Sequence, residues 1–259
     1  CVKAILAGKK PNIPHLELIT NIQLIDGTGS PARVCSVRLR DNKIWETGDL
    51  TPLPGESVTD GGGKVLAPGF IDSHSHHFGG LMDSPGGLAL VSQGVTSIVI
   101  GQDGNSYPID TLEQMMKETP VAINVATYTG HTTVRETVMG ENDVLRIARP
   151  EEVVQMQALM KAEMDKGSLG LATGLEYERA FYSNRSEVLD LAKTTAASGG
   201  RYISHIRSED VGLDEAVAAH RHRRVEARVR RPRRRVRRAR GGARVAGARV
   251  TGARRRRAA

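Results

Sequence analysis

Three histidines lie within four positions at the end of one short apolar segment, in the stretch APGFIDSHSHH (67–77). His74 and His76 are two residues apart, so on a strand their side chains would share a face, whereas His77 would point the other way. Two imidazoles on one interior face are difficult to explain as packing, because buried polar groups need partners. We therefore predict that His74 and His76 bind a divalent metal such as zinc, and that His77 is structural or faces solvent.

Polar side chains also follow four further apolar segments. In chain order they are Gln102, Asp103, His131, Glu176, Tyr177, His205 and Arg207. We predict Asp103 and His205 as metal ligands, and Glu176 as a further candidate. Simpler roles stay open for some of them. Asp103 could cap a loop between two glycines, Glu176 could pair with Arg179 at a rim, and His131 could cap a turn in the sequence GHTT.

The elements that must position these residues alternate between strand and helix. Strands are predicted at residues 65–71, 96–100, 121–126, 168–172 and 201–205, and helices at 110–118, 150–167 and 185–200. Asp110 is predicted as a helix cap, Pro150 lies in a first turn, and Gly167 ends a helix. This alternation predicts a parallel α/β sheet or barrel. In a (β/α)8 barrel, residues that follow the strands share the C-terminal rim.

A small β part precedes the barrel segment. The stretches LELITNIQLID (16–26) and RVCSVRLRDNKI (33–44) have strand-like alternation, with turns at residues 27–29 and 41–42. We assign residues 14–64 to this part and residues 65–220 to five β/α units. Residues 1–13 show no clear periodicity and are an uncertain extension.

The charge is unevenly distributed along the 259 residues. The net charge is +8, but residues 221–259 hold 18 arginines and one acidic residue, Glu226, which leaves the preceding residues with a net charge of −9. The basic average therefore says nothing about the partners of the folded part. We expect residues 221–259 to be disordered. They are either a frameshift product, which we favour, or a basic arm that binds nucleic acid nonspecifically.

Cysteine usage and hydropathy indicate the compartment. Cys1 and Cys35 have neither metal-binding spacing nor a disulfide framework, which fits a reducing, cytoplasmic setting. No apolar run approaches the roughly 18–20 residues of a membrane span. The chain begins at Cys1 rather than at methionine, so we expect the natural N-terminus, and any signal peptide in it, to be missing.

Five motifs carry a family resemblance. They are LIDGTGSPAR, VLAPGFIDSHSHH, QGVTSIVIGQDG, GSLGLATGLEY and RYISHIRSED. The second resembles the first-strand signature of the amidohydrolase superfamily of metal-dependent hydrolases. Together the motifs resemble the D-aminoacylase group, the N-acyl-D-amino-acid deacylases. The resemblance covers about residues 16–220 and is specific, because the motifs occur in order at fitting distances.

The resemblance implies a small β-sandwich beside a (β/α)8 barrel, with one or two zinc ions at the barrel mouth. His74 and His76 match first-strand ligands, and His205 matches a fifth-strand ligand. Asp103 stands where D-aminoacylases usually place a bridging cysteine, within an Asn-Cys-Gly sequence. A carboxylate can also ligate and bridge zinc, so the exchange leaves the number of ions open. Glu176 could take over the bridging role of a fourth-strand carboxylate.

The implied reaction is hydrolysis of the amide bond of an N-acyl-D-amino acid, a small-molecule substrate. Zinc would lower the pKa of a bound water and polarise the acyl carbonyl. Tyr177 matches a tyrosine that contacts substrate, and we expect Arg207 and His131 to contact it as well. The family's sixth-strand histidine and eighth-strand aspartate, the general base, have no counterpart in residues 221–259. We therefore expect this chain to be an incomplete barrel, poorly folded and inactive by itself.

Two other functions remain as alternatives. A cyclic-amide amidohydrolase, such as a dihydroorotase or a hydantoinase, ranks lower because Glu176 rather than a lysine lies at the fourth-strand rim. A basic-tailed nucleic-acid binder on a degenerate barrel would use residues 221–259.

Overall fold

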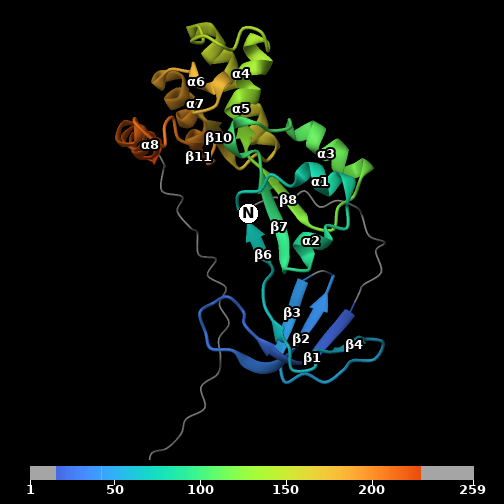
Figure 1. The fold of residues 1–259 in the computed structure, drawn as a ribbon. Coiled ribbons are helices and arrows are strands. Elements are labelled where there is room, and N and C mark those ends of the chain that lie inside the picture. Colours follow the sequence, from blue (N-terminus) through green and yellow to red (C-terminus); the bar gives the residue numbers. More distant parts are fainter. Residues whose placement is uncertain (1–15, 42, 229–259) are drawn as a thin grey trace, which may run out of the picture.

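The computed structural model describes residues 16–41 and 43–228. Figure 1 shows two parts along the chain: a sheet near the N-terminus, in blue, and a larger part in which strands alternate with helices. The predictions for residues 1–13 and for residues 229–259 lie outside the described residues.

The first part is a five-stranded sheet. Its strands are β1 (Leu16–Leu24), β2 (Arg33–Arg40), β3 (Lys43–Gly48), β4 (Ser57–Asp60) and β5 (Val65–Leu66). β2 pairs antiparallel with β1 and β3, whereas β4 and β5 run parallel to β1. Alternate apolar residues of β1, such as Ile22 and Leu24, pack with Val37 of β2 in a small core. The strands of residues 16–66 form one sheet, so a β-sandwich stays a prediction.

The second part contains six parallel strands. They are β6 (Phe70–Asp72), β7 (Val95–Ile100), β8 (Asn124–Thr127), β9 (Thr129–Gly130), β10 (Gly170–Gly174) and β11 (Arg201–His205). β6 pairs with β7 and β7 with β8, while β9 pairs with β10 and β10 with β11. All these pairs are parallel and join neighbours in the sequence, as the predicted barrel requires.

Two predicted strands are interrupted. The strand predicted at residues 65–71 is divided at Pro68 and Gly69, so that β5 joins the first sheet and β6 joins the second. The strand predicted at residues 121–126 is shifted and divided at Tyr128, whose backbone N–H donates to the Ile100 carbonyl at 2.9 Å. β8 therefore pairs with β7, and β9 pairs with β10. The predicted third strand, divided in this way, links the two three-stranded sheets.

The helices follow the strands in turn. They are α1 (Phe78–Asp83), α2 (Leu88–Val91), the 3-10 turn η1 (Gln102–Gly104), α3 (Ile109–Glu118), α4 (His131–Met139), α5 (Pro150–Lys166), α6 (Glu178–Phe181), α7 (Arg185–Ala197) and α8 (Leu213–Arg228). Pro150 begins α5 and Gly167 follows its end, as predicted. The cap predicted at Asp110 is wrong: Pro108 holds the cap position of α3, and Asp110 lies inside the first turn, where its charge suits the helix dipole.

The boundary predicted at residue 220 is corrected by α8, which continues to Arg228. Disorder is therefore wrong for residues 221–228. A helix that is already formed extends at little cost through arginine, alanine and glutamate, which are good helix formers.

Two apolar clusters lie between the parallel strands and their helices. Ile98 and Val125 pack with Leu112 and Met116 of α3, and Leu171 packs with Met156, Met160 and Leu191 of α5 and α7. These clusters leave the loops after the strands free for polar side chains.

Among the described residues, no helix combines the length and the apolar character that a membrane span needs.

Candidate metal centre

The loop after β6 carries the two candidate histidines. β6 ends at Asp72, so the prediction that His74 and His76 lie on a strand is wrong. Their Nε2 atoms nevertheless lie 3.2 Å apart. The loop stays beside β7 because the backbone N–H of Ser75 donates to the Val99 carbonyl at 2.9 Å, and the Asp72 carboxylate accepts from the His74 N–H at 3.2 Å. The two imidazoles therefore converge as expected, but because their loop is held against β7 and not because they share one face of a strand.

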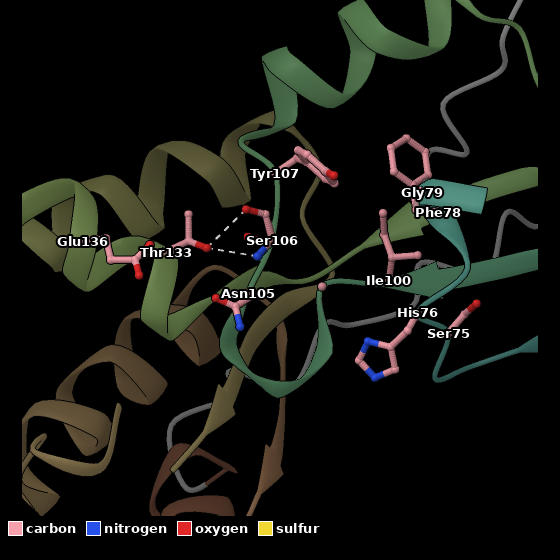
Figure 2. A pocket seen from close by; sticks show the side chains of 11 residues that line it. Ser75, His76, Phe78, Gly79, Ile100, Asn105, Ser106, Tyr107, Thr133 and Glu136 are labelled. Atoms are coloured by element: carbon pink, nitrogen blue, oxygen red, sulfur yellow. Dashed lines mark hydrogen bonds between the residues drawn. The ribbon is translucent and has the colours of Figure 1, made fainter. Parts of the chain in front are cut away.

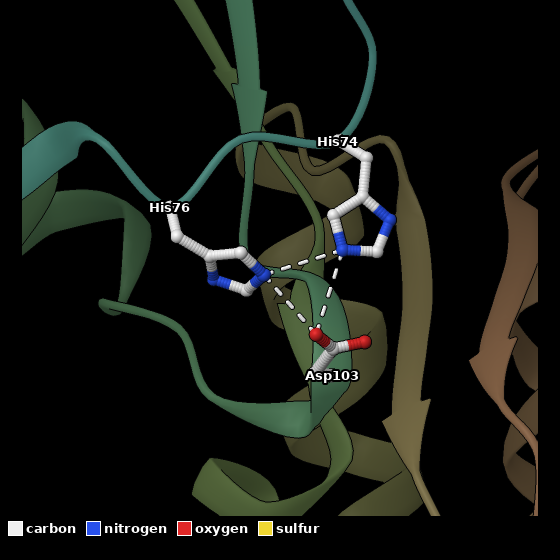
Figure 3. A group of neighbouring side chains, drawn as sticks. All are labelled: His74, His76 and Asp103. Carbon is white, nitrogen blue, oxygen red and sulfur yellow. Dashed lines mark hydrogen bonds and ion pairs between the residues drawn. The ribbon is translucent and has the colours of Figure 1, made fainter.

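Asp103 faces the two imidazoles from the turn after β7 (Figure 3). Its Oδ2 atom lies 3.4 Å from Nε2 of His74 and 3.1 Å from Nε2 of His76. The backbone of Asp103 is left-handed, with φ 58° and ψ 21°. This conformation is accessible to aspartate and turns the carboxylate back toward the loop after β6.

The three atoms have the spacing of zinc ligands. In a tetrahedral zinc site with bonds of about 2.0–2.1 Å, neighbouring ligand atoms are about 3.3–3.4 Å apart. The Nε2, Nε2 and Oδ2 atoms are separated by 3.2, 3.4 and 3.1 Å. Two imidazoles and one carboxylate are also a donor set that zinc accepts. The residues therefore fit the metal that the sequence predicted.

A second group of candidate ligands lies at the ends of β10 and β11. His205 Nε2 is 2.9 Å from Glu176 Oε2 and 3.7 Å from Glu209 Oε1. Asp103 stands between the two groups, since its Oδ1 is 3.9 Å from Nδ1 of His205. The predicted ligands are thus brought together as two groups that meet at Asp103. Glu209 was missed, although its spacing of four residues from His205 could have suggested it.

Tyr177 lies against His205 at this rim. Its hydroxyl is 3.3 Å from Nδ1 of His205, and the two ring centroids are 4.8 Å apart. Burial raises the pKa of the Tyr177 phenol, and the nearby carboxylates of Asp103 and Glu176 raise it further. The phenol is therefore neutral at neutral pH and keeps a proton that it can donate.

Arg207 binds the chain between α6 and α7. Its guanidinium donates to the carbonyl of Phe181, and to the carbonyl and hydroxyl oxygens of Ser183 at 2.9 and 3.2 Å. These bonds tie the end of β11 to the segment that follows Tyr177. The contact with substrate that was predicted for Arg207 stays a prediction.

His131 is in a different environment from the one predicted. Its side chain is fully buried, and its Nε2 lies 2.7 Å from Glu187 Oε1. Arg135 donates from Nη1 to both oxygens of Glu187 at 2.6 Å. The structure therefore corrects the prediction that His131 contacts substrate, because the imidazole is enclosed between α4 and α7. His77, by contrast, is exposed and directly precedes α1, as expected.

A cavity of about 400 Å³ lies beside His76 (Figure 2). Its lining includes the aromatic rings of Phe78 and Tyr107, together with Ile100 and the polar Ser106. Ser106 is held in place because its backbone N–H donates to Thr133 Oγ1 at 2.9 Å. A cavity of this size, adjacent to a candidate metal ligand, has room for a small organic molecule.

Two glycines let the Asp103 turn approach its neighbours. A Cβ atom added to Gly174 would lie 2.1 Å from the Asp103 carbonyl oxygen, and one added to Gly130 would lie 2.3 Å from the Gly104 carbonyl oxygen. Backbone atoms cannot yield as the end of a flexible side chain can. The turn therefore occupies a slot that only glycine leaves open.

We expect Gly174→Ala to weaken zinc binding at least tenfold, because it would displace the Asp103 backbone. Gly86→Ala is the matched control, since a Cβ at Gly86 meets nothing within 4 Å and Gly86 is not in the left-handed region. Zinc affinity would be measured by competition with a chromophoric chelator. Equal zinc affinity in the two variants would show that the slot does not position Asp103.

Comparisons with known proteins show similarity to amidohydrolases. The sequence profile of the amidohydrolase family matches residues 57–243. An N-acyl-D-aspartate deacylase from Alcaligenes xylosoxydans xylosoxydans is 36% identical over 217 residues, which cover 74% of this chain and 43% of that protein. A D-aminoacylase from the same organism is 32% identical over 216 residues, or 74% of this chain and 44% of that protein. The chain thus spans less than half the length of these relatives.

Solved structures show the same relationship. A D-aminoacylase studied for its binuclear metal centre superimposes with a TM-score of 0.73 at 28% identity, over 82% of this chain and 49% of that one. The N-acyl-D-glutamate deacylase of Bordetella bronchiseptica, solved with zinc and a phosphonate inhibitor, gives 0.71 at 29% identity, over 80% and 48%. A dihydroorotase gives 0.51 at 15% identity over 79% and 54%, which shows a shared fold alone.

The fold prediction is confirmed at the level of a TIM-barrel-type metal hydrolase, and so is the resemblance to the D-aminoacylase group. The residues matched by the family profile include both groups of candidate metal ligands and the strands that carry them. On these grounds the chain belongs to the amidohydrolase family.

Proposed function

We propose that the whole protein hydrolyses the amide bond of N-acyl-D-amino acids at a zinc centre held by His74, His76 and Asp103. The observation that carries this proposal is the triangle of ligand atoms at 3.1–3.4 Å, at the ends of parallel strands. The deacylase relatives from Alcaligenes support the substrate class.

Each of the three residues has a defined task in this proposal. When bound, zinc would act as a Lewis acid and would lower the pKa of its bound water molecule to near neutrality. His74 and His76 offer Nε2 lone pairs, and Asp103 offers a carboxylate that offsets part of the charge of the cation. The side chain of Asp103 is 18% exposed, so its attraction to a cation is less screened by water than that of a surface carboxylate.

A second cation position is proposed at Glu176, His205 and Glu209. One ligand atom from each of these residues lies within 4.8 Å of the others. Asp103 lies beside this group but does not complete it, because its Oδ1 is 3.9 Å from Nδ1 of His205, whereas Glu176 and Glu209 face Nε2 of the same ring.

Tyr177 is proposed to hold the substrate beside these positions. Its neutral hydroxyl lies at the same rim as His205 and is 45% exposed as a residue, so it can reach a ligand. Such a hydroxyl can donate a hydrogen bond to a carboxylate or carbonyl oxygen of an acylated amino acid.

The enantiomers of one substrate test this function. We expect the full-length protein with zinc to release amino acid from an N-acyl-D-amino acid at least 100-fold faster than from its L-enantiomer. N-acyl-aspartate, N-acyl-glutamate and an N-acyl neutral amino acid would be compared as D/L pairs, with His76→Ala as the inactive control.

Two results would remove the deacylase assignment: equal turnover of the enantiomers, or turnover of neither. A hydantoin and dihydroorotate serve as further substrates in the same assay. Turnover of these cyclic amides without turnover of the D-acyl substrates would favour the cyclic-amide alternative.

A further inference from the structure

We propose that Gln102 is a positioning residue for the metal centre, which fixes the loop of His74 and His76 to the turn of Asp103. This inference rests on the zinc centre proposed above. It assigns a task to a side chain that belongs to neither group of candidate ligands among the described residues.

The Gln102 amide joins two segments of the chain. Its Nε2 donates one hydrogen bond to the Ser73 carbonyl and one to the Val99 carbonyl, both at 2.9 Å. Ser73 directly precedes His74, and Val99 belongs to β7. The Val99 carbonyl also accepts from the backbone N–H of Ser75, at 2.9 Å. The histidine loop and the Gln102 side chain therefore meet at one carbonyl group.

Burial makes this contact rigid. Gln102 is 2% exposed, so water has little access to its amide. Its Oε1 atom is buried and has no hydrogen-bond partner among the described residues. An unpaired buried oxygen costs free energy that a hydrocarbon side chain of the same length would avoid. The two donated bonds offset this cost, and both of them hold backbone segments in place.

The position of Gln102 in the chain links this contact to the metal site. Asp103 is the next residue, and its carboxylate must meet two imidazoles that come from another segment. Oδ2 of Asp103 lies 3.4 Å from Nε2 of His74 and 3.1 Å from Nε2 of His76, which are distances expected between ligands of one metal ion. A metal site loses function when its ligands are displaced by about 1 Å. Mutation of a residue that orients the ligands, without itself binding the metal, typically changes metal affinity by about 10–100-fold.

Gln102→Met tests this inference, because methionine keeps an unbranched side chain and removes both donors. Gln157→Met is the matched control. The Gln157 amide also joins two elements, α5 and α7, since its Nε2 donates to Thr194 Oγ1 at 3.0 Å and to the Asp190 carbonyl at 3.4 Å. Neither of these acceptors adjoins a candidate ligand, whereas the Ser73 acceptor of Gln102 directly precedes His74.

Three quantities would be measured for the parent chain and for each variant. They are zinc affinity by chelator competition, the absorption spectrum of bound Co²⁺, and the midpoint of thermal unfolding without metal. We expect Gln102→Met to bind zinc about 10–100-fold more weakly and to change the Co²⁺ bands. Gln157→Met should keep both metal properties of the parent, whatever its effect on the unfolding midpoint.

Gln102→Asn keeps the test decisive if the methionine variant does not fold. Its amide is one methylene shorter and cannot reach both carbonyls, so it too should bind zinc at least tenfold more weakly. A folded Gln102 variant with the zinc affinity and Co²⁺ spectrum of the parent would overturn this inference alone. A parent chain that binds no zinc would overturn both this inference and the proposed metal centre.

Discussion

Glu187→Gln is expected to lower the free energy of unfolding by about 3–5 kcal/mol, because it leaves a buried guanidinium without its counter-charge. The side chain of Glu187 is 1% exposed, and that of Arg135 is fully buried. Arg135 also donates from Nη2 to the carbonyls of Val144 and Arg146 at 2.8 and 2.6 Å. These bonds hold the guanidinium inside the protein, so it cannot move to solvent when its partner loses its charge.

Glu215→Gln is the control for this prediction. Glu215 pairs with Arg185 on the surface, with side-chain exposures of 75% and 63%, and an exposed pair of this kind contributes little. Chemical denaturation of the full chain would compare both variants with the parent. If Glu187→Gln destabilised the protein no more than Glu215→Gln, the buried contact between the side chains of α4 and α7 would not stabilise the fold.

The same cluster should make the protein less stable in acid. Burial lowers the pKa of His131 below its ordinary value of 6.5, so in acid the unfolded chain binds a proton that the folded chain does not. Burial alone would raise the pKa of Glu187, but the hydrogen bonds from His131 and Arg135 outweigh it and lower this pKa below 4.5. Stability is therefore present above pH 6.5, declines as the pH falls below it, and declines further below pH 4.5.

His131→Gln should flatten the decline between pH 6.5 and 4.5, because glutamine does not titrate. Denaturation midpoints measured at several pH values in this range would show the difference. An unchanged slope would mean that His131 binds its proton equally well in the folded and the unfolded chain.

Much of the fold could be predicted from the sequence because its signals are local. The strands at residues 96–100 and 201–205 and the helix that begins at Pro150 are where periodicity and caps predicted them. The break in the first strand was missed, although Pro68 and Gly69 lie in the middle of it. Proline and glycine interrupt strand pairing, and here the chain passes from one sheet to the other between them.

The site was predictable in its composition but less so in its geometry. The types and spacing of His74, His76 and Asp103 indicated a metal site, and the structure brings these residues together. His131 was misassigned because burial depends on long-range packing: its partner Glu187 is 56 residues away in the sequence. Gln102 was noted beside Asp103, but no local pattern shows that its amide reaches the carbonyl of Ser73.

The zinc centre makes a strong prediction about two neighbouring histidines. His76→Ala should lose most of the bound zinc, because it removes one of three ligand atoms that lie 3.1–3.4 Å apart. His77→Ala should keep the zinc, because His77 lies outside both groups of candidate ligands found among the described residues. The two variants delete the same side chain from adjacent positions, so a general effect of removing an imidazole is controlled.

The proposed zinc centre is tested most directly by elemental analysis. Zinc per chain would be measured in the parent, in His76→Ala and in His77→Ala. The expected result is a zinc content in His77→Ala equal to that of the parent and a much lower content in His76→Ala. Equal zinc contents in the two variants would contradict a metal centre built from His74, His76 and Asp103.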